Sequence, residues 1–198
     1  ALNQLANYVD TVIGVFIFDS SQIKKCSTNS NYHSSQAAQF FVDSVTDLKH
    51  QCNNKLVIAY GNTLKILESI IAAVEPDAVS FNADFTPRSV ERDDAMIELC
   101  NKHNIKVIAN TEDQLHKNST LLLKPDKTPY MVFGPFTKNL FSSPIPTPTT
   151  KTIKWTSSKK INIVSLEDKG WTPTQTIFKG GRSQALLKMK MSTAPVDN

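Results

Sequence analysis

Residues 11–18 read TVIGVFIF, a run in which mostly apolar side chains, many of them β-branched or aromatic, follow one another without polar alternation. A strand of this composition is typical of a parallel sheet, where both faces of the strand are covered. Three shorter runs of the same character follow along the chain: LVIAY at 56–60, AVSFN at 78–82 and IKVIA at 105–109. We expect these runs to be further strands of one sheet.

Helical patterns fill the segments between these runs. Ser34 or Ser35 is placed to cap a helix that reaches about Asn53. A second helix is stopped by Pro76, and a third reaches about His103. Strands and helices in alternation predict an α/β fold, namely a Rossmann-like doubly wound parallel sheet with right-handed crossovers.

The chain opens with a helical pattern, Leu2, Leu5, Ala6 and Val9, and not with the strand that normally opens such a sheet. We therefore expect the first, central strand to be missing and its position to be empty or filled by something else. A buried apolar strand is worth ~5–10 kcal/mol at about 25 cal/mol per Å². A whole domain is stable by only about 5–15 kcal/mol. The chain alone should therefore be marginally stable unless a second chain supplies that strand.

The texture of the sequence changes after residue 109. A hairpin is expected around residues 124–127, and a short helix over residues 183–191. Prolines 144, 146, 148 and 173 stand among Ser, Thr and Lys, which predicts an extended Pro/Lys/Thr-rich linker and no core element. We predict an α/β domain over residues 1–142 and, over residues 143–198, a linker with the beginning of a further domain.

Charge and cysteine content restrict the function classes. Residues 1–123 hold ten Lys and Arg against fourteen Asp and Glu, whereas residues 124–190 hold twelve against three. The basic segment fits either a solvated linker or a nucleic-acid contact. Three scattered cysteines predict reduced thiols and an intracellular protein, cytoplasmic or nuclear and not secreted. The single sequon at Asn118 is weak, and no apolar run is long enough to place the chain in a membrane.

The familiar catalytic and phosphate-binding motifs are absent from the sequence, and the four histidines lack metal-ligand spacing. We therefore predict neither catalytic residues nor a metal site. His50 and His103 fall near helix C-termini, where a partly positive side chain is favourable. The segment Gly180-Gly181-Arg182-Ser183 does not follow a strand and is not expected to bind phosphate.

One polar constellation stands out. Residues 81–89 (FNADFTPRS), with Glu91, Arg92, Asp93 and Asp94, lie where a strand ends and a helix begins. Ligands of open α/β sheets bind at such carboxyl ends. Equally, the segment fits a plain turn in which Thr86 caps the helix and Pro87 is its first residue. The sequence alone leaves both interpretations open.

Several segments, in order along the chain, resemble the N-terminal α/β domain of the class I photolyase and cryptochrome family. They are 15–19 (VFIFD), 39–48 (QFFVDSVTDL), 81–87 (FNADFTP) with Arg92-Asp93, 127–136 (KTPYMVFGPF) and 180–186 (GGRSQAL). The resemblance runs from Ala1 to about Lys188. It implies an antenna domain that holds a chromophore, either a folate or a deazaflavin, within a light-driven DNA-repair or signalling protein.

The same resemblance implies site residues. The candidate pigment contacts are Phe18, stacking on a ring, Asp84, accepting a hydrogen bond, and Arg88, facing a carboxylate or phosphate, together with Asp19, Asn82 and Ser89. In the family FAD and the DNA lesion bind a helical domain that follows the linker. FAD is thus expected only outside this chain, DNA contact is expected to be indirect, and activity of the chain alone is not expected.

The sequence also departs from the family pattern. The opening strand and its arginine-rich loop are missing, and the two Trp positions after residue 136 hold Thr137 and Leu140. These departures suggest a split or truncated gene product. The alternative is a non-enzymatic partner module that completes its sheet in trans with a separately encoded photolyase segment or flavin domain. A generic nucleotide-binding Rossmann-like domain is a weaker alternative because no glycine-rich phosphate loop is present.

Overall fold

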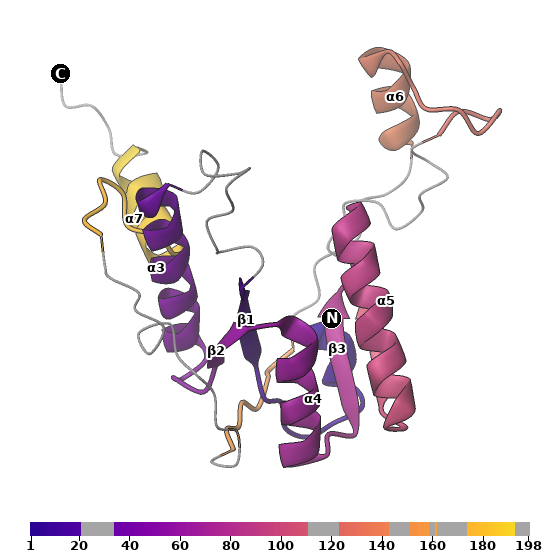
Figure 1. Cartoon of the computed structure of the whole chain (residues 1–198). Coiled ribbons are helices and arrows are strands. Elements are labelled where there is room, and N and C mark those ends of the chain that lie inside the picture. Colours follow the sequence, from indigo (N-terminus) through magenta and orange to yellow (C-terminus); the bar gives the residue numbers. More distant parts are fainter. Residues whose placement is uncertain (21–33, 111–122, 143–150, 159–160, 162–173, 193–198) are drawn as a thin grey trace. The chain divides into compact units, whose positions relative to one another are not determined.

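The computed structural model describes residues 1–20, 34–110, 123–142, 151–158, 161 and 174–192. The chain forms two compact units (Figure 1). Unit 1 comprises residues 1–10 and 76–153, and unit 2 comprises residues 11–75 and 154–198. In chain order the elements are α1 (Leu2–Leu5), β1 (Val15–Asp19), α3 (Ser35–Gln51), β2 (Val57–Gly61), α4 (Thr63–Val74), β3 (Ala78–Asn82), α5 (Pro87–Lys102), β4 (Lys106–Asn110), α6 (Phe133–Leu140) and α7 (Arg182–Ser192).

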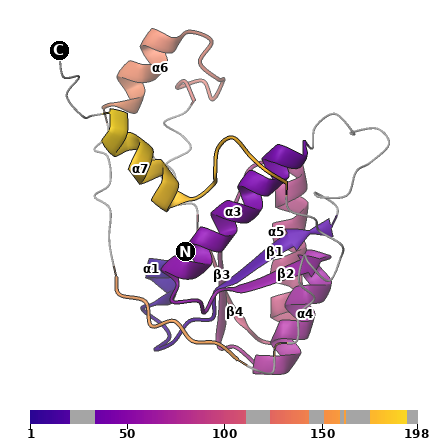
Figure 2. The same ribbon diagram turned by 90° about the vertical axis from the view of Figure 1, so that its left-hand side faces the viewer.

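Unit 2 is built on the parallel pair β1–β2, in which Val15 faces Val57 and Asp19 faces Gly61. Strands β1 and β2 lie side by side (Figure 2), and they pair without interruption from Val15–Val57 to Asp19–Gly61. The apolar core of this unit lies between the strands and α3, and its buried members are Phe18, Val45, Cys52 and Leu56. Burial of these side chains is the main force that holds α3 to the strands.

The segment around Trp155 corrects one prediction. We expected the Pro/Lys/Thr-rich stretch to contribute nothing to a core, yet the Trp155 ring packs against the apolar core of unit 2. Val12 pairs with Trp155 in a parallel bridge, and the Lys55 Nζ donates to the Trp155 carbonyl oxygen over 2.9 Å. A Cβ at Gly14 would lie 2.9 Å from the Trp155 ring, so the glycine makes room for it. Protein cores are closely packed, so a large apolar ring can fill space in a core even when the sequence around it is rich in Pro, Lys and Thr.

Unit 1 is built on the parallel pair β3–β4, in which Ala78 faces Lys106 and Asn82 faces Asn110. Helix α1 contacts β3, and α5 contacts β4. The predicted first helix is shorter than expected, because regular helix ends at Leu5 and turns follow it. The Lys106 ammonium lies 3.5 Å from the centre of the Tyr8 ring, a cation–π contact between β4 and the turn after α1.

The predicted strands are all present and parallel, so the α/β class is confirmed. In the part of the chain that the structure describes they form two separate sheets of two strands each, β1–β2 and β3–β4. The finer prediction of a Rossmann-like doubly wound arrangement stays a prediction. Apart from the buried Phe18, the apolar residues of β1 and β3 are only partly buried, although the sequence predicted cover on both faces. The predicted missing central strand stays a prediction.

Helix boundaries agree with the sequence to within a few residues. Ser34 caps α3 by accepting from the Ala37 N–H at 3.0 Å, as predicted. The predicted hairpin is present as a bridge between Leu123 and Pro129 around a turn. Helix α6 was not predicted, because Gly134 and Pro135 argue against a helix; both fall in its first turn, where proline is tolerated.

Some predictions concern residues that the structure does not describe. They concern one of the three cysteines, Cys26, two of the four histidines, His33 and His116, the sequon at Asn118, and prolines 144, 146, 148 and 173. The boundary between predicted domains at 142/143 borders such residues and stays a prediction; the two compact units divide the chain differently. Among the described helices, none has the length and apolar character needed to cross a bilayer.

Candidate functional site at the strand ends

The six predicted site residues fall into two groups. Phe18 and Asp19 end β1 in unit 2, whereas Asn82, Asp84, Arg88 and Ser89 lie between β3 and the first turn of α5 in unit 1. Each group lies at the carboxyl end of a parallel strand, as predicted. Asp84 and Ser89 are in direct contact, since the Ser89 hydroxyl donates to Asp84 Oδ2 over 3.0 Å.

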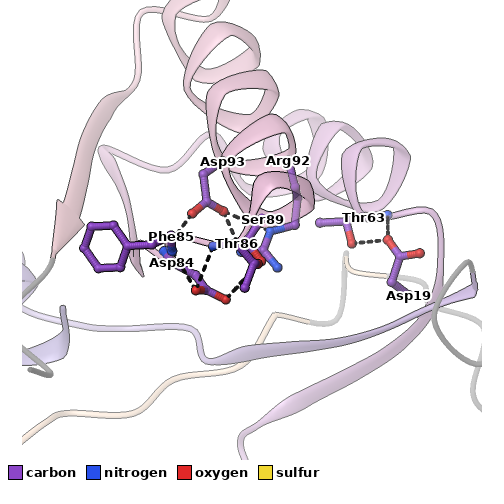
Figure 3. Close-up of polar contacts among 8 residues, drawn as sticks. All are labelled: Asp19, Thr63, Asp84, Phe85, Thr86, Ser89, Arg92 and Asp93. Carbon is purple, nitrogen blue, oxygen red and sulfur yellow. Dashed lines mark hydrogen bonds and ion pairs between the residues drawn. The ribbon is translucent and has the colours of Figure 1, made fainter. Parts of the chain in front are cut away.

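Asp19 joins the end of β1 to the beginning of α4. Its Oδ2 accepts from the Thr63 hydroxyl at 2.6 Å and from the Thr63 N–H at 3.2 Å (Figure 3). Asp19 thus satisfies an amide of the first turn of α4, which has no partner within the helix. Thr63 was not singled out from the sequence, although a Thr that opens a helix after a strand is a signal for such a contact.

Phe18 is a residue of the apolar core. It is 2% exposed and lies in the apolar core of unit 2, with its ring edge-on to the rings of Phe16 and Phe41, each 5.1 Å from it between centroids. Its stacking on a pigment stays a prediction. In this structure its ring contacts are those of a core residue, worth about 0.5–1.5 kcal/mol per aromatic pair beyond area burial.

Asp84 organises the loop that leads into α5. Its Oδ1 accepts from the backbone N–H of Phe85 at 2.6 Å and of Thr86 at 3.3 Å, and its Oδ2 accepts from the Ser89 and Thr86 hydroxyls (Figure 3). The Thr86 N–H, the Ser89 hydroxyl and the Phe85 N–H hold the pKa of Asp84 below its ordinary value. Thr86 occupies the N-cap position, but its side chain makes no cap bond, so the predicted cap by Thr86 is not formed. Asp84 orders the loop before the helix and does not cap it, because its amide donors, Phe85 and Thr86, precede the first helical residue, Pro87.

Asp93 fixes this loop from within α5. It is 5% exposed, its Oδ1 accepts from Arg92 at 2.9 Å (Nε) and 2.6 Å (a terminal nitrogen), and its Oδ2 accepts from the Asp84 N–H at 3.3 Å. A buried carboxylate requires such partners. The sequence carried a signal for it: Asp93 stands on the same helical stripe as Val90, Ile97 and Cys100, where an apolar side chain would be ordinary.

The chemistry available at the unit 1 strand end is polar and partly cationic. Asn82 and Arg88 are exposed, and the Phe85 ring is 62% exposed beside them in sequence. These side chains offer an amide, a cation and an aromatic face, the groups that bind a flat conjugated ring with an anionic tail. The carboxylate of Asp84 is already engaged by its own loop, so the predicted acceptor role toward a ligand competes with four existing bonds.

The remaining titratable candidates are structural. His50 lies in the last turn of α3 and His103 caps the C-terminus of α5, as predicted. Burial raises the pKa of the Cys52 and Cys100 thiols, which keeps them protonated and poorly nucleophilic. The residues that the structure describes contain no group of three or more His, Cys, Asp or Glu able to hold a metal ion.

Comparison with known proteins gives a consistent family. The sequence model described as DNA photolyase matches residues 1–151. A deoxyribodipyrimidine photo-lyase of Synechococcus sp. is 28% identical over 98 residues, which are 50% of this chain and 20% of that protein. The chain therefore spans only part of the curated relative that it matches.

Solved structures show the same fold. A photolyase from Sulfolobus tokodaii, described with two FAD molecules and a novel light-harvesting cofactor, matches with a TM-score of 0.65 at 20% identity, over 96% of this chain and 42% of that one. A class III photolyase from Agrobacterium tumefaciens gives 0.67 at 22%, over 96% and 40%. A cryptochrome from Synechocystis sp. gives 0.76 at 14%, over 91% and 40%.

Proposed function

The chain belongs to the DNA photolyase family, and on that premise we propose that it acts as the antenna domain of a light-driven DNA-repair protein. In this role it binds a light-absorbing pigment and delivers the absorbed energy to a flavin held elsewhere. The pigment class is a folate or a deazaflavin. A flavin is a further candidate because the Sulfolobus tokodaii relative is described with two FAD molecules and a light-harvesting cofactor. The chain alone is proposed to have no catalytic activity.

The observation that carries this proposal is the exposed group at the carboxyl end of β3. Asn82, Phe85 and Arg88 are exposed there, while Asp84 and Asp93 hold the loop in one conformation. A rigid loop loses little conformational entropy when a ligand binds, which favours affinity. We assign ring contact to Phe85, hydrogen bonding to Asn82 and the anionic part of the pigment to Arg88, with Asp84 and Ser89 as positioning residues.

A pigment titration of the full chain tests this proposal. A reduced folate, a deazaflavin and FAD are titrated separately, and binding is followed by the change in pigment fluorescence. One of the three is expected to bind, and Arg88→Gln should weaken it about tenfold, the loss of one charge-assisted contact. Lys102→Gln is the matched control, because Lys102 lies in the last turn of the same helix and pairs with Glu98 over 3.2 Å at the surface.

Two results would count against the antenna role. A folded chain that binds none of the three pigments contradicts it directly. Equal pigment affinities of the parent, the Arg88→Gln variant and an Asn82→Ala variant would mean that the pigment does not bind at the end of β3. Amide exchange of β3 and β4 in the same samples distinguishes lost binding from lost folding.

The second candidate function is a partner module that completes its sheet in trans. It is favoured by the strand arrangement, in which β1 and β3 each have one neighbouring strand among the described residues. An edge of this kind accepts a further strand by backbone hydrogen bonding. The proposed partner is a separately encoded photolyase segment or flavin domain, with DNA contacted only through that partner. An intracellular location, with no membrane partner, remains part of this proposal.

Hydrogen exchange distinguishes the two candidates. A strand supplied by a co-expressed photolyase segment should slow amide exchange in β1 or β3 and should purify together with the chain. Slow exchange of both strands in the isolated chain, with no change on co-expression, would contradict completion in trans and leave the pigment result unaffected.

A further inference from the structure

Helix α3 carries a stripe of polar side chains on one of its faces. Gln39, Asp43, Asp47 and Gln51 are spaced four residues apart, and we call them the α3 polar stripe. They are linked in pairs: Gln39 Nε2 donates to Asp43 Oδ1 at 2.8 Å, and Gln51 Nε2 donates to Asp47 Oδ2 at 2.7 Å. The pairing fixes the rotamers and leaves acceptor oxygens of Gln39 and Asp47 in defined directions.

Both of these acceptors bind the C-terminal part of unit 2. The Thr174 N–H donates to Gln39 Oε1 at 2.9 Å, where Gln39 is buried. Asp47 accepts from the Ser183 N–H at 3.2 Å and from the Ser183 hydroxyl at 2.6 Å. Asp47 is therefore the cap of α7, supplied by another helix, and it satisfies an amide that the first turn of α7 leaves without an internal partner. Helix α7 contacts α3.

Two glycines let the backbone approach α3. A Cβ added at Gly180 would lie 2.0 Å from the Phe40 carbonyl oxygen and 2.4 Å from Ser44 Oγ. A Cβ added at Gly181 would lie 2.7 Å from Asp47 Cβ, and Gly181 has a φ of +110°, a conformation that other residues rarely adopt. The pair Gly180-Gly181 is thus demanded by the α3 surface and by the backbone, which the sequence alone did not reveal.

From these contacts we propose that α3 is a docking surface which recognises a Gly-Gly-Xaa-Ser helix start, and that its occupant is residues 174–192 of this chain. Recognition is directed at backbone amides and at the absence of side chains. Apolar side chains of α7 contribute little, because Leu187 and Met189 are mostly exposed. A contact of this kind is specific but modest in strength, so the segment can detach and rebind as one piece.

Hydrogen exchange on the full chain tests the proposal. Gly181→Ala should speed amide exchange over residues 182–192 at least tenfold, whereas amides of β1 and β2 should keep their parent rates. Gly134→Ala is the matched control, since an added Cβ there meets nothing within 4 Å. Parent-like exchange over residues 182–192 in Gly181→Ala would overturn the proposal.

A milder variant guards against simple unfolding. Ser183→Ala removes the 2.6 Å bond to Asp47 and replaces Ser with a better helix former, so faster exchange over residues 182–192 would identify the lost contact as the cause. Slower or equal exchange would mean that α7 is stabilised by its own helix propensity and not by the contact with Asp47, which would contradict docking.

The same segment supplied separately gives an independent readout. A synthetic peptide of residues 174–192 should bind the Gly181→Ala chain and slow exchange in α3, and the peptide with Gly181→Ala should not. If neither peptide binds, or if both do, α3 does not recognise this helix start. Mass measurement at rising protein concentration reports a second copy as the occupant, and a dimer linked by exchanged α7 helices would overturn docking within one chain.

Discussion

The two strand pairs have the same length and the same parallel pairing, yet they are stabilised differently. Unit 2 buries mostly apolar side chains in its described part, with Phe18, Val45 and Leu56 packed around β1–β2. Among the described residues of unit 1 the buried apolar side chains are Leu5, Cys100 and Ile105, and the polar Asp93 and Asn110 are buried with them. Strand pairing by itself is thus not what distinguishes a core from a site. The pair with the apolar core supports the fold, and the pair with the polar loop holds the candidate site residues at its end.

The largest expected effect comes from the apolar core of unit 2. Phe18→Ala removes a ring from the cluster formed with Phe16 and Phe41 and should lower the free energy of unfolding of unit 2 by about 3–5 kcal/mol. Amide exchange of β1 and β2 in urea measures it. Phe85→Ala, at a ring that is 62% exposed in unit 1, is the control and should change unfolding little. Equal losses in the two variants would contradict the contrast between the units.

The next effect concerns the buried carboxylate of unit 1. Asp93→Ala removes the acceptor of Arg92 and of the Asp84 N–H, and should cost about 1–3 kcal/mol in exchange of β3 and α5 amides. Asp94→Ala, at an exposed neighbour, should fall within about 0.5 kcal/mol of the parent. If pigment binding falls with Asp93→Ala while the fold persists, the loop held by Asp93 is part of the site.

Features that depend on residues close together in the sequence could be predicted, whereas contacts between distant residues could not. The four strands, the helices α3, α4 and α5 and the Ser34 cap depend on residues a few positions apart, so hydrophobic spacing and turn chemistry were sufficient to predict them. The contacts of Trp155 with Val12 and of Asp47 with Ser183 join residues more than a hundred positions apart. No local pattern announces them, and the first contradicted our expectation of a linker without a core role.

The candidate site was predicted in position but not in the roles of its residues. Asn82, Asp84, Arg88 and Ser89 do gather at one strand end, because a βα connection brings them there. Asp84 was expected to face a ligand, whereas its oxygens bond to the loop amides and hydroxyls. An aspartate three residues before the first residue of a helix serves either purpose, and only the backbone conformation decides between them.

A smaller effect should distinguish these purposes. Asp84→Ala removes the acceptor of the Phe85 and Thr86 N–H groups in the loop before α5 and should lower the melting temperature by roughly 2–4 °C, the usual shift for a loss of about 1 kcal/mol in a chain of this length. Thr86→Val should change it less, since the Thr86 side chain makes no cap bond to the helix. If Asp84→Ala loses pigment binding with unchanged exchange in α5, Asp84 contacts the pigment itself, and the assignment as positioning residue is wrong.

The smallest effect is a response to acid that separates the two units. Hydrogen bonds from Thr86, Ser89 and Phe85 lower the pKa of Asp84 in unit 1, and those from the Ser183 hydroxyl and N–H lower the pKa of Asp47 in unit 2. A lowered pKa means that the charged form is favoured by folding, so each contribution is complete above the ordinary value of 3.8 and is lost as the pH falls through the lowered pKa. Amides of α5 and α7 should therefore both exchange faster, relative to the intrinsic rate, when the pH drops below that value.

Asp84→Asn should remove the extra acid sensitivity of α5 and leave that of α7 as in the parent, and Asp47→Asn should do the reverse. Loss of acid sensitivity in both helices from either variant would mean that the two units unfold together in acid, and that the difference between their cores does not make them independent.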